Sequence, residues 1–165
     1  MLSYVEIGMK EGARLVSGGR IPEDPALARG FFVEATVFAD VTASMRIFQE
    51  EVFGPFTSIT RFEDEAEAIA LANDSPFGLA GAVRTMNIVR AHRVAAKLRC
   101  RIVWINDHHR LDPASPWGGV GDSGIGRECG TESFDAHFQT KSVMVRVDDQ
   151  PFDWYQNTAT QPRLN

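Results

Sequence analysis

The sequence has few cysteines and no long apolar run. Its only cysteines, Cys100 and Cys129, form no CxxC pair, which argues against a disulfide scaffold or a zinc ribbon. No apolar stretch approaches the roughly 20 residues that a membrane-spanning helix needs. Residues 1–10 show no basic segment followed by an apolar one, so no secretory signal is visible. We therefore predict a cytoplasmic protein with no membrane partner.

Basic residues are also in the minority. The chain has 17 Lys and Arg against 22 Asp and Glu, which gives a net charge of −5. This balance provides no electrostatic attraction for nucleic acid, which we exclude as a partner. The hydrophobic fraction of 44% is typical of soluble globular proteins. A length of 165 residues fits about one packed domain.

Segments with strand character alternate along the chain with segments of helical periodicity. Strands are predicted at 14–17, 33–38, 56–62, 79–84, 102–106 and 143–147, and helices at 2–11, 43–50, 88–98 and 132–138. The clearest helix follows Asp64, which can form a capping box with Glu67, and ends at Asn73. This order predicts an α/β fold with a mainly parallel sheet and flanking helices.

Residues 107–126 form a long loop that contains a GxGxxG match, Gly119 to Gly124. The dinucleotide-binding fingerprint requires a strand directly before the glycines and a helix directly after them. Here the preceding predicted strand ends at residue 106, and Pro116 intervenes. We therefore favour a turn in which the backbone passes close to another segment.

No metal site and no catalytic residue is predicted. His108 and His109 are adjacent, so on extended backbone they point to opposite faces, and no third ligand accompanies them. Cys100 and Cys129 have no evident base beside them. Since a reactive thiol needs an identifiable activating environment, both are interpreted as free and structurally neutral.

The most distinctive segment is Glu50-Glu51-Val52-Phe53-Gly54-Pro55. A carboxylate there can accept hydrogen bonds from two ribose hydroxyls, and the neighbouring aromatic ring can pack against a flat heterocycle. The alternative is a helix end that carries solvated acids.

This segment resembles the EE-(I/V)-FGP motif of the aldehyde dehydrogenase superfamily. Further motifs of that family recur in the same order: Asn73 with Phe77-Gly78-Leu79-Ala80, then Val103-Trp104-Ile105-Asn106, then Pro116-Trp117-Gly118-Gly119 with Ser123-Gly124-Ile125-Gly126-Arg127-Glu128, and finally Thr140-Lys141-Ser142-Val143. The resemblance extends from about residue 2 to residue 147.

The resemblance implies an NAD- or NADP-dependent enzyme that oxidises a small aldehyde to its carboxylic acid, by covalent catalysis followed by general-base hydrolysis. Glu51 matches the family glutamate that binds the nicotinamide ribose, and Phe53 matches the aromatic residue near the nicotinamide ring. Trp117 and Leu111 match substrate-facing positions. Trp117 with residues 106–109 is similar to betaine-aldehyde and aminoaldehyde dehydrogenases, in which an indole can hold a cationic group. The alternative is that Trp117 walls an apolar funnel.

The resemblance also implies a division of the chain. Residues 1–138 correspond to the later part of the catalytic domain, 139–147 to an oligomerisation strand, and 148–165 to a polar tail. Homo-oligomers are expected to pair through residues 140–147. The family nucleophile, in a Gly-Gln-x-Cys context, and its general-base glutamate match no residue here, so we expect this fragment alone to be inactive. The alternative is a non-catalytic oligomerising module from a truncated gene.

Overall fold

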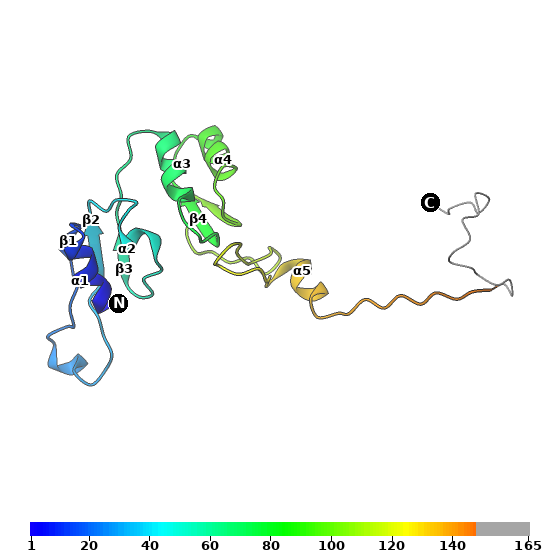
Figure 1. The fold of residues 1–165 in the computed structure, drawn as a ribbon, viewed down its shortest axis with the longest axis horizontal. Helices are drawn as coiled ribbons and strands as arrows, with labels where there is room; N and C mark the ends of the chain where they lie inside the picture. Colours follow the sequence, from blue (N-terminus) through cyan, green and yellow to red (C-terminus); the bar gives the residue numbers. More distant parts are fainter. Residues whose placement is uncertain (148–165) are drawn as a thin grey trace, which may run out of the picture.

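A three-stranded sheet organises the first lobe, which we define as residues 1–60. The computed structural model describes residues 1–147 (Figure 1). Strands β1 (Arg14–Ser17), β2 (Thr36–Ala39) and β3 (Phe56–Ser58) lie in the order β1-β2-β3. Strand β2 is antiparallel to β1 and parallel to β3. Helices α1 (Leu2–Lys10) and α2 (Arg46–Gln49) contact each other, and a short 3-10 helix, η1 (Pro25–Leu27), lies in the loop between β1 and β2.

The core of the described chain lies in this first lobe. Alternation along β2 turns Thr36 and Phe38 inward, and Phe38 is fully buried. The ring of Phe38 stacks on Phe56 with centroids 5.4 Å apart. A Cβ on Gly8 would lie 3.0 Å from the side chain of Ile47 and 3.2 Å from the Phe38 ring. Glycine at this position therefore lets α1 pack closely against α2 and β2.

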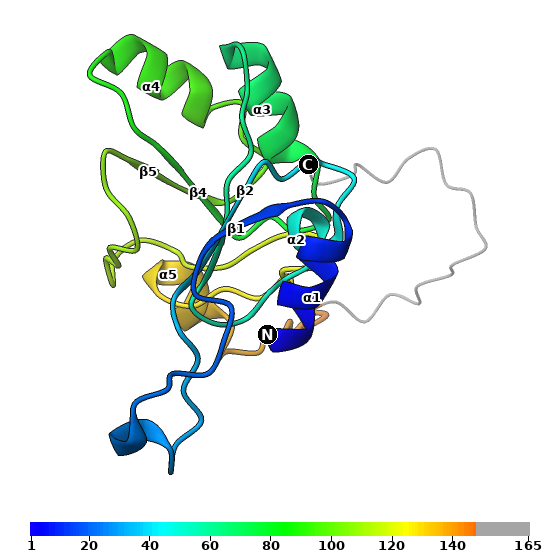
Figure 2. The ribbon, with the colours of Figure 1, turned by 90° about the vertical axis from the view of Figure 1, so that its left-hand side faces the viewer.

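The second lobe, residues 61–138, contains a β-α-β unit. Strands β4 (Ala80–Val83) and β5 (Ile102–Ile105) are parallel and are connected through helix α4 (Ile88–Ala95), which contacts both strands. Helix α3 (Glu65–Asn73) lies on the same side of this sheet as α4 (Figure 2). The last helix of the lobe is α5 (Gly130–Asp135).

In the second lobe, α3 and α4 each begin at a residue whose side chain caps the helix. Asp64 accepts a hydrogen bond from the Glu67 N–H at 2.8 Å, as the capping box predicts. The Glu67 carboxylate bonds back to the Glu63 N–H at 2.6 Å, one residue before the N-cap. Asn87 caps α4 through the Arg90 N–H at 2.9 Å.

Two asparagine side chains each connect separate backbone segments of the second lobe: Asn106 links the ends of β5 and β4, and Asn73 links the ends of α3 and α4. The Asn106 side chain accepts a hydrogen bond from the Thr85 N–H at 2.8 Å and donates one to the Thr85 carbonyl at 2.9 Å. Asn73 donates to the Lys97 carbonyl at 2.9 Å and accepts from the Arg99 N–H at 2.7 Å. Both side chains therefore hold backbone segments of the second lobe in register.

The sheet differs from the prediction of one mainly parallel sheet. The strands form two sheets, and one of the three strand pairs, β1–β2, is antiparallel. The reason is that residues 18–35 reverse the chain direction without a crossover helix between these two strands, which a parallel pair would need. The remaining two pairs are parallel.

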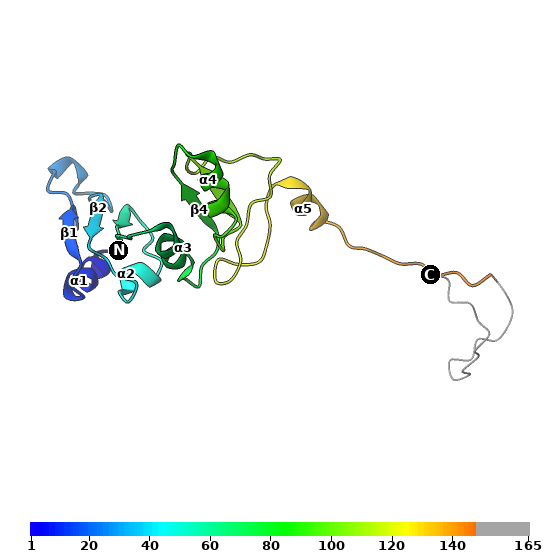
Figure 3. The same cartoon turned by 90° about the horizontal axis from the view of Figure 1, so that it is seen from above.

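Residues 143–147, predicted as a strand, do not form a strand within the single chain. Residues 139–147 run away from α5 in extended form (Figure 1, Figure 3). Val143, Met144, Val145 and Val147 are 74%, 93%, 76% and 95% exposed. A strand needs a second strand beside it, so pairing across subunits through 140–147 stays a prediction. The predicted tail at 148–165 lies outside the described residues.

Candidate functional site

The two adjacent glutamates after α2 have different surroundings. Glu50 accepts hydrogen bonds from the Tyr4 hydroxyl at 2.8 Å and from Nε and Nη2 of Arg46 at 2.7 and 2.9 Å. Glu51 is exposed, and no side chain within residues 1–147 forms a hydrogen bond or an ion pair with it. Glu50 therefore joins α1 to α2, while the Glu51 carboxylate is available for a ligand.

Arg46 controls the protonation of Glu50. Its guanidinium, together with the Tyr4 hydroxyl, lowers the pKa of Glu50 from 4.5 to about 2. The hydrogen bond to the Glu50 carboxylate in turn raises the pKa of Tyr4. Arg46 also lies over the Tyr4 ring, 5.7 Å from its centroid. This three-residue contact fixes the start of the loop that carries Glu51.

The Glu50 contact should make stability depend on pH in the acid range. A carboxyl whose pKa is lowered by folding stabilises the protein above its unfolded pKa and loses that effect as pH falls through its folded pKa. We expect the stability difference between wild type and Glu50→Gln to be largest above pH 4.5 and to disappear as the pH falls through about 2. Urea unfolding at several pH values measures it. Glu51→Gln is the matched control, and a similar pH dependence in that variant would contradict the assignment.

Phe53 presents its ring to solvent beside Glu51. Its side chain is 89% exposed, and the next residue, Gly54, allows a close approach that a Cβ would obstruct at 2.7 Å from the Met1 sulfur. The loop from Glu51 to Gly54 has no regular secondary structure. Within residues 1–147, an unpaired carboxylate and an exposed aromatic ring thus lie two residues apart in the sequence.

Trp117 belongs to a cluster of four aromatic rings. The indole of Trp104, on β5, lies 6.0 Å from Trp117, 5.6 Å from His108 and 6.1 Å from His109, measured between ring centroids. His109 also contacts Trp117 at 6.2 Å. The Trp104 Nε1 donates to the Arg110 carbonyl at 2.9 Å. Trp104 therefore connects the start of the loop after β5 to the later part of the same loop, which carries Trp117.

Sequence reasoning missed the roles of Trp104 and His109 in this cluster. From the sequence, His109 was rejected as a metal ligand, residues 106–109 were related to Trp117 only through the family resemblance, and Trp104 was only part of a strand motif. Within the described residues, no three His, Cys, Asp or Glu side chains converge in a group that could hold a metal ion. An aromatic residue on a strand, followed by two histidines and a later indole, was the available signal.

The structure does not place the two predicted pairs in one cavity. Leu111, 58% exposed, follows the aromatic cluster in the second lobe, whereas Glu51 and Phe53 lie in the first. Neither pair lines either of the two cavities, of about 600 and 390 Å³, that are found within the described chain. The roles of Glu51, Phe53, Trp117 and Leu111 stay predictions.

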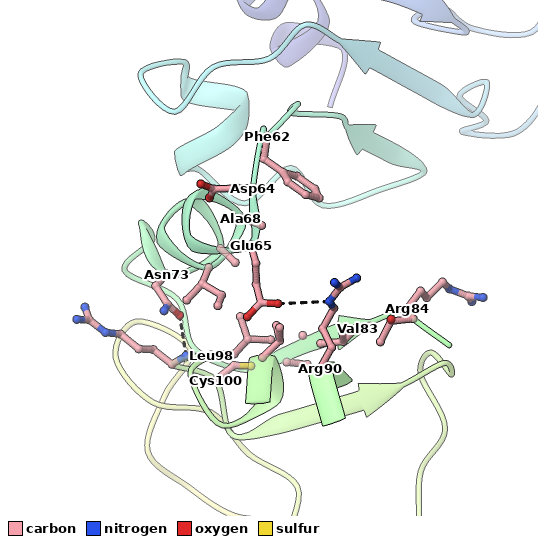
Figure 4. A pocket seen from close by; sticks show the side chains of 18 of the residues that line it. Phe62, Asp64, Glu65, Ala68, Asn73, Val83, Arg84, Arg90, Leu98 and Cys100 are labelled. Carbon is pink, nitrogen blue, oxygen red and sulfur yellow. Dashed lines mark hydrogen bonds and ion pairs between the residues drawn. The ribbon is translucent and has the colours of Figure 1, made fainter. Parts of the chain in front are cut away.

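The larger of these cavities, about 600 Å³, lies between α3, α4 and the β4–β5 sheet (Figure 4). An ion pair between Glu65 and Arg90, 3.5 Å apart, lies among its lining side chains. Cys100 also lines it, and burial raises the pKa of this thiol. A raised pKa keeps the sulfur protonated at neutral pH, which disfavours nucleophilic attack by Cys100.

The glycine-rich loop is a docked turn, as its sequence context predicted. The N–H groups of Val120 and Asp122 donate to the carbonyls of Gly78 and Pro76 at 3.3 and 3.0 Å. Gly121 has φ +60°, and a Cβ there would lie 2.5 Å from the Pro76 carbonyl oxygen. The turn therefore packs against the segment before β4, and no strand or helix flanks it directly.

Comparison with known proteins now identifies the chain. The chain matches an oxidoreductase family: the model of the "Aldehyde dehydrogenase family" covers residues 1–143. The chain therefore belongs to the aldehyde dehydrogenase family, which confirms the resemblance found in its motifs.

Similar proteins include curated enzymes from bacteria and plants. The chain is 47% identical to betaine aldehyde dehydrogenase of Bacillus subtilis (strain 168), an alignment that covers 92% of the chain and 31% of the relative. It is 43% identical to the peroxisomal aminoaldehyde dehydrogenase 2 of Malus domestica, covering 96% and 31%. The chain thus spans about a third of the length of these relatives.

Solved structures agree with this assignment. The betaine aldehyde dehydrogenase of Staphylococcus aureus in complex with NAD+ matches with a TM-score of 0.88 at 45% identity, over 94% of the chain and 31% of that protein. The Mycobacterium tuberculosis aldehyde dehydrogenase complexed with NAD+ matches with a TM-score of 0.82 at 46% identity, over 88% and 29%. No helix within residues 1–147 is long and apolar enough to cross a membrane.

Proposed function

We propose that this chain supplies the nicotinamide-ribose clasp and part of the substrate wall of an NAD(P)-dependent aldehyde dehydrogenase, which oxidises an aldehyde to its carboxylic acid. The observation that carries the proposal is the contrast between two neighbouring carboxylates. Glu50 is engaged by Tyr4 and Arg46, while Glu51 has no side-chain partner within residues 1–147 and is two residues from the exposed Phe53.

The residues present fit a nicotinamide nucleotide. The Glu51 carboxylate has free acceptor positions for two vicinal hydroxyls, and the Phe53 ring offers a flat apolar face. The cofactor, when bound, would supply the hydride acceptor. Two similar structures are complexes with NAD+, which supports NAD for this chain as well.

Substitution of Glu51 should weaken binding of nicotinamide riboside, the part of the cofactor that this loop would contact. Hydrogen bonds to a charged acceptor contribute about 1.5–3 kcal/mol, so we expect Glu51→Gln to raise the dissociation constant about tenfold or more. NMR titration of the chain measures it. Glu6→Gln removes one exposed carboxylate elsewhere, on α1, and serves as control. Equal affinity in both variants would favour a merely solvated Glu51.

For the substrate, we propose an aldehyde with a cationic end. The Trp117 indole lies among Trp104, His108 and His109, and a cation over an aromatic face gains about 0.5–2 kcal/mol. The names of the similar betaine aldehyde and aminoaldehyde dehydrogenases support the same class. In the alternative, Trp117 only walls an apolar funnel, and a neutral aldehyde of similar size would then bind equally well.

We further propose that the 165-residue chain alone is inactive. Neither of its cysteines lies in the Gly-Gln-x-Cys context of the family nucleophile, and the thiol of Cys100 has a raised pKa. Aldehyde turnover by the purified chain, above a Cys100→Ser/Cys129→Ser control, would overturn this.

A second candidate is a non-catalytic module that pairs through residues 140–147. The exposed side chains of Val143, Val145 and Val147 favour it, because an apolar extended segment with no neighbouring strand tends to pair with another chain. Light scattering of wild type and Val145→Lys tests the pairing: an oligomer that the substitution dissociates supports it, and a monomeric wild type contradicts it.

A further inference from the structure

A single arginine closes the loop that carries Trp117. One terminal nitrogen of Arg127, Nη1, donates to the carbonyls of Gly119 and Gly126 at 2.7 Å each, with a longer contact to the Ile125 carbonyl at 3.3 Å. The side chain is 22% exposed, and its ion pair with Glu132 is long, at 3.7 Å. Its main partners are therefore backbone carbonyls before and after the turn at residues 120–124.

The backbone segments before and after this turn also pair with each other, at Trp117 and Glu128. The Trp117 N–H donates to the Glu128 carbonyl at 2.6 Å, and the Glu128 N–H donates to the Trp117 carbonyl at 2.7 Å. These two bonds form an isolated antiparallel bridge. The bridge thus fixes the backbone of Trp117, and the Arg127 contacts hold the backbone at Gly119, two residues further along.

Gly118 leaves the space that Arg127 occupies. A Cβ at this position would lie 2.9 Å from both Cδ and Nη1 of Arg127, and 2.3 Å from the Gly126 carbonyl oxygen. A side chain on the residue next to Trp117 would therefore displace the guanidinium. Gly118 and Arg127 form one packing arrangement, which is independent evidence that the arginine belongs inside the loop.

We propose that Arg127 is a positioning residue that sets the Trp117 indole in the aromatic cluster and thereby at the substrate end of the site. This rests on the proposed substrate role of Trp117. A guanidinium suits the task because its planar set of donors can reach several carbonyls at once, whereas a lysine offers a flexible point charge.

The experiment uses the full chain with Trp154→Phe, which leaves Trp104 and Trp117 as its indoles. Two indoles with centroids 6.0 Å apart give a coupled circular dichroism signal that depends on their mutual orientation. We expect Arg127→Met to abolish most of this coupled signal and Arg127→Lys to weaken it. Hydrogen exchange at the Trp117 amide should become about tenfold faster in Arg127→Met.

Arg101→Met is the control, because Arg101 is exposed and outside the loop. Exchange at the Ile59 amide, which donates to the Phe38 carbonyl in the first lobe, should not change in either arginine variant, which separates a loop effect from general unfolding. An unchanged coupled signal and unchanged Trp117 exchange in both Arg127→Lys and Arg127→Met would overturn the proposal.

Titration with tetramethylammonium chloride, against potassium chloride, separates this proposal from the proposed function. A fluorescence response in wild type that is lost in Arg127→Met supports both. If wild type does not respond but the coupled signal still depends on Arg127, the arginine role stands and the cationic substrate fails. An equal response in wild type and Arg127→Met contradicts the positioning role.

Discussion

Phe38→Ala should unfold most of the first lobe, with an expected loss of about 3–5 kcal/mol in the free energy of unfolding. Phe38 is completely buried, stacks on Phe56 and contacts the region of α1 at Gly8. Removal of the ring leaves a cavity between the sheet and both helices, so transfer energy and packing contacts are lost together. Because folded domains are stable by only about 5–15 kcal/mol, this loss is a large fraction of the total.

Urea unfolding followed by far-ultraviolet circular dichroism measures the effect. Phe31→Ala is the matched control: it removes the same side chain from a fully exposed position and should change stability by less than about 0.5 kcal/mol. Similar losses in the two variants would mean that the β2 core does not determine the stability of the chain.

Gly121→Ala should detach the glycine-rich loop from the segment before β4. The substitution combines a left-handed backbone, φ +60°, with a Cβ only 2.5 Å from the Pro76 carbonyl oxygen. A non-glycine residue in that conformation costs about 1–2 kcal/mol, and an overlap with backbone adds about 1–3 kcal/mol. We expect the amides of Val120 and Asp122, which bond across this contact, to exchange at least about tenfold faster.

Two other glycines distinguish the conformational cost of Gly121→Ala from the cost of its overlap with Pro76. Gly124 has φ +92° but open space where a Cβ would lie, whereas Gly126 has open space and no positive φ. Gly124→Ala should therefore show the conformational cost alone, and Gly126→Ala should be close to neutral. If Gly121→Ala behaves like Gly124→Ala, the contact with Pro76 does not hold the loop.

Both structural predictions bear on the candidate site. The first lobe presents Glu51 and Phe53 on a loop that begins at the Tyr4–Arg46–Glu50 contact. The second lobe presents Trp117 on a loop held by Gly121 and Arg127. Rigid support of both loops would keep the side chains that we propose to face the ligand in a single geometry.

Local sequence signals were reliable where the controlling contact is local. Asp64 and Glu67 lie three residues apart, and the predicted Asp64 cap is present, although Glu67 accepts from the Glu63 N–H and not from the N-cap Asp64. The context of Gly119 to Gly124 favoured a turn over a nucleotide fingerprint, and the loop is a docked turn. The predicted strand at 143–147 failed as a strand within the chain, because strand formation depends on a partner that local periodicity does not supply.

The sequence by itself determined the family, the order of the α-helices and strands from α1 to α5, and the presence of a glutamate–aromatic pair at residues 51 and 53. Only the tertiary structure decided which of two adjacent glutamates is engaged, that the strands divide into two sheets, and that Trp104 and His109 gather around Trp117. The physical reason is the separation along the sequence over which each interaction acts. Caps, turns and periodicity act within a few residues, whereas Tyr4 reaches Glu50 across 46 positions, and such contacts are selected by packing of the whole chain.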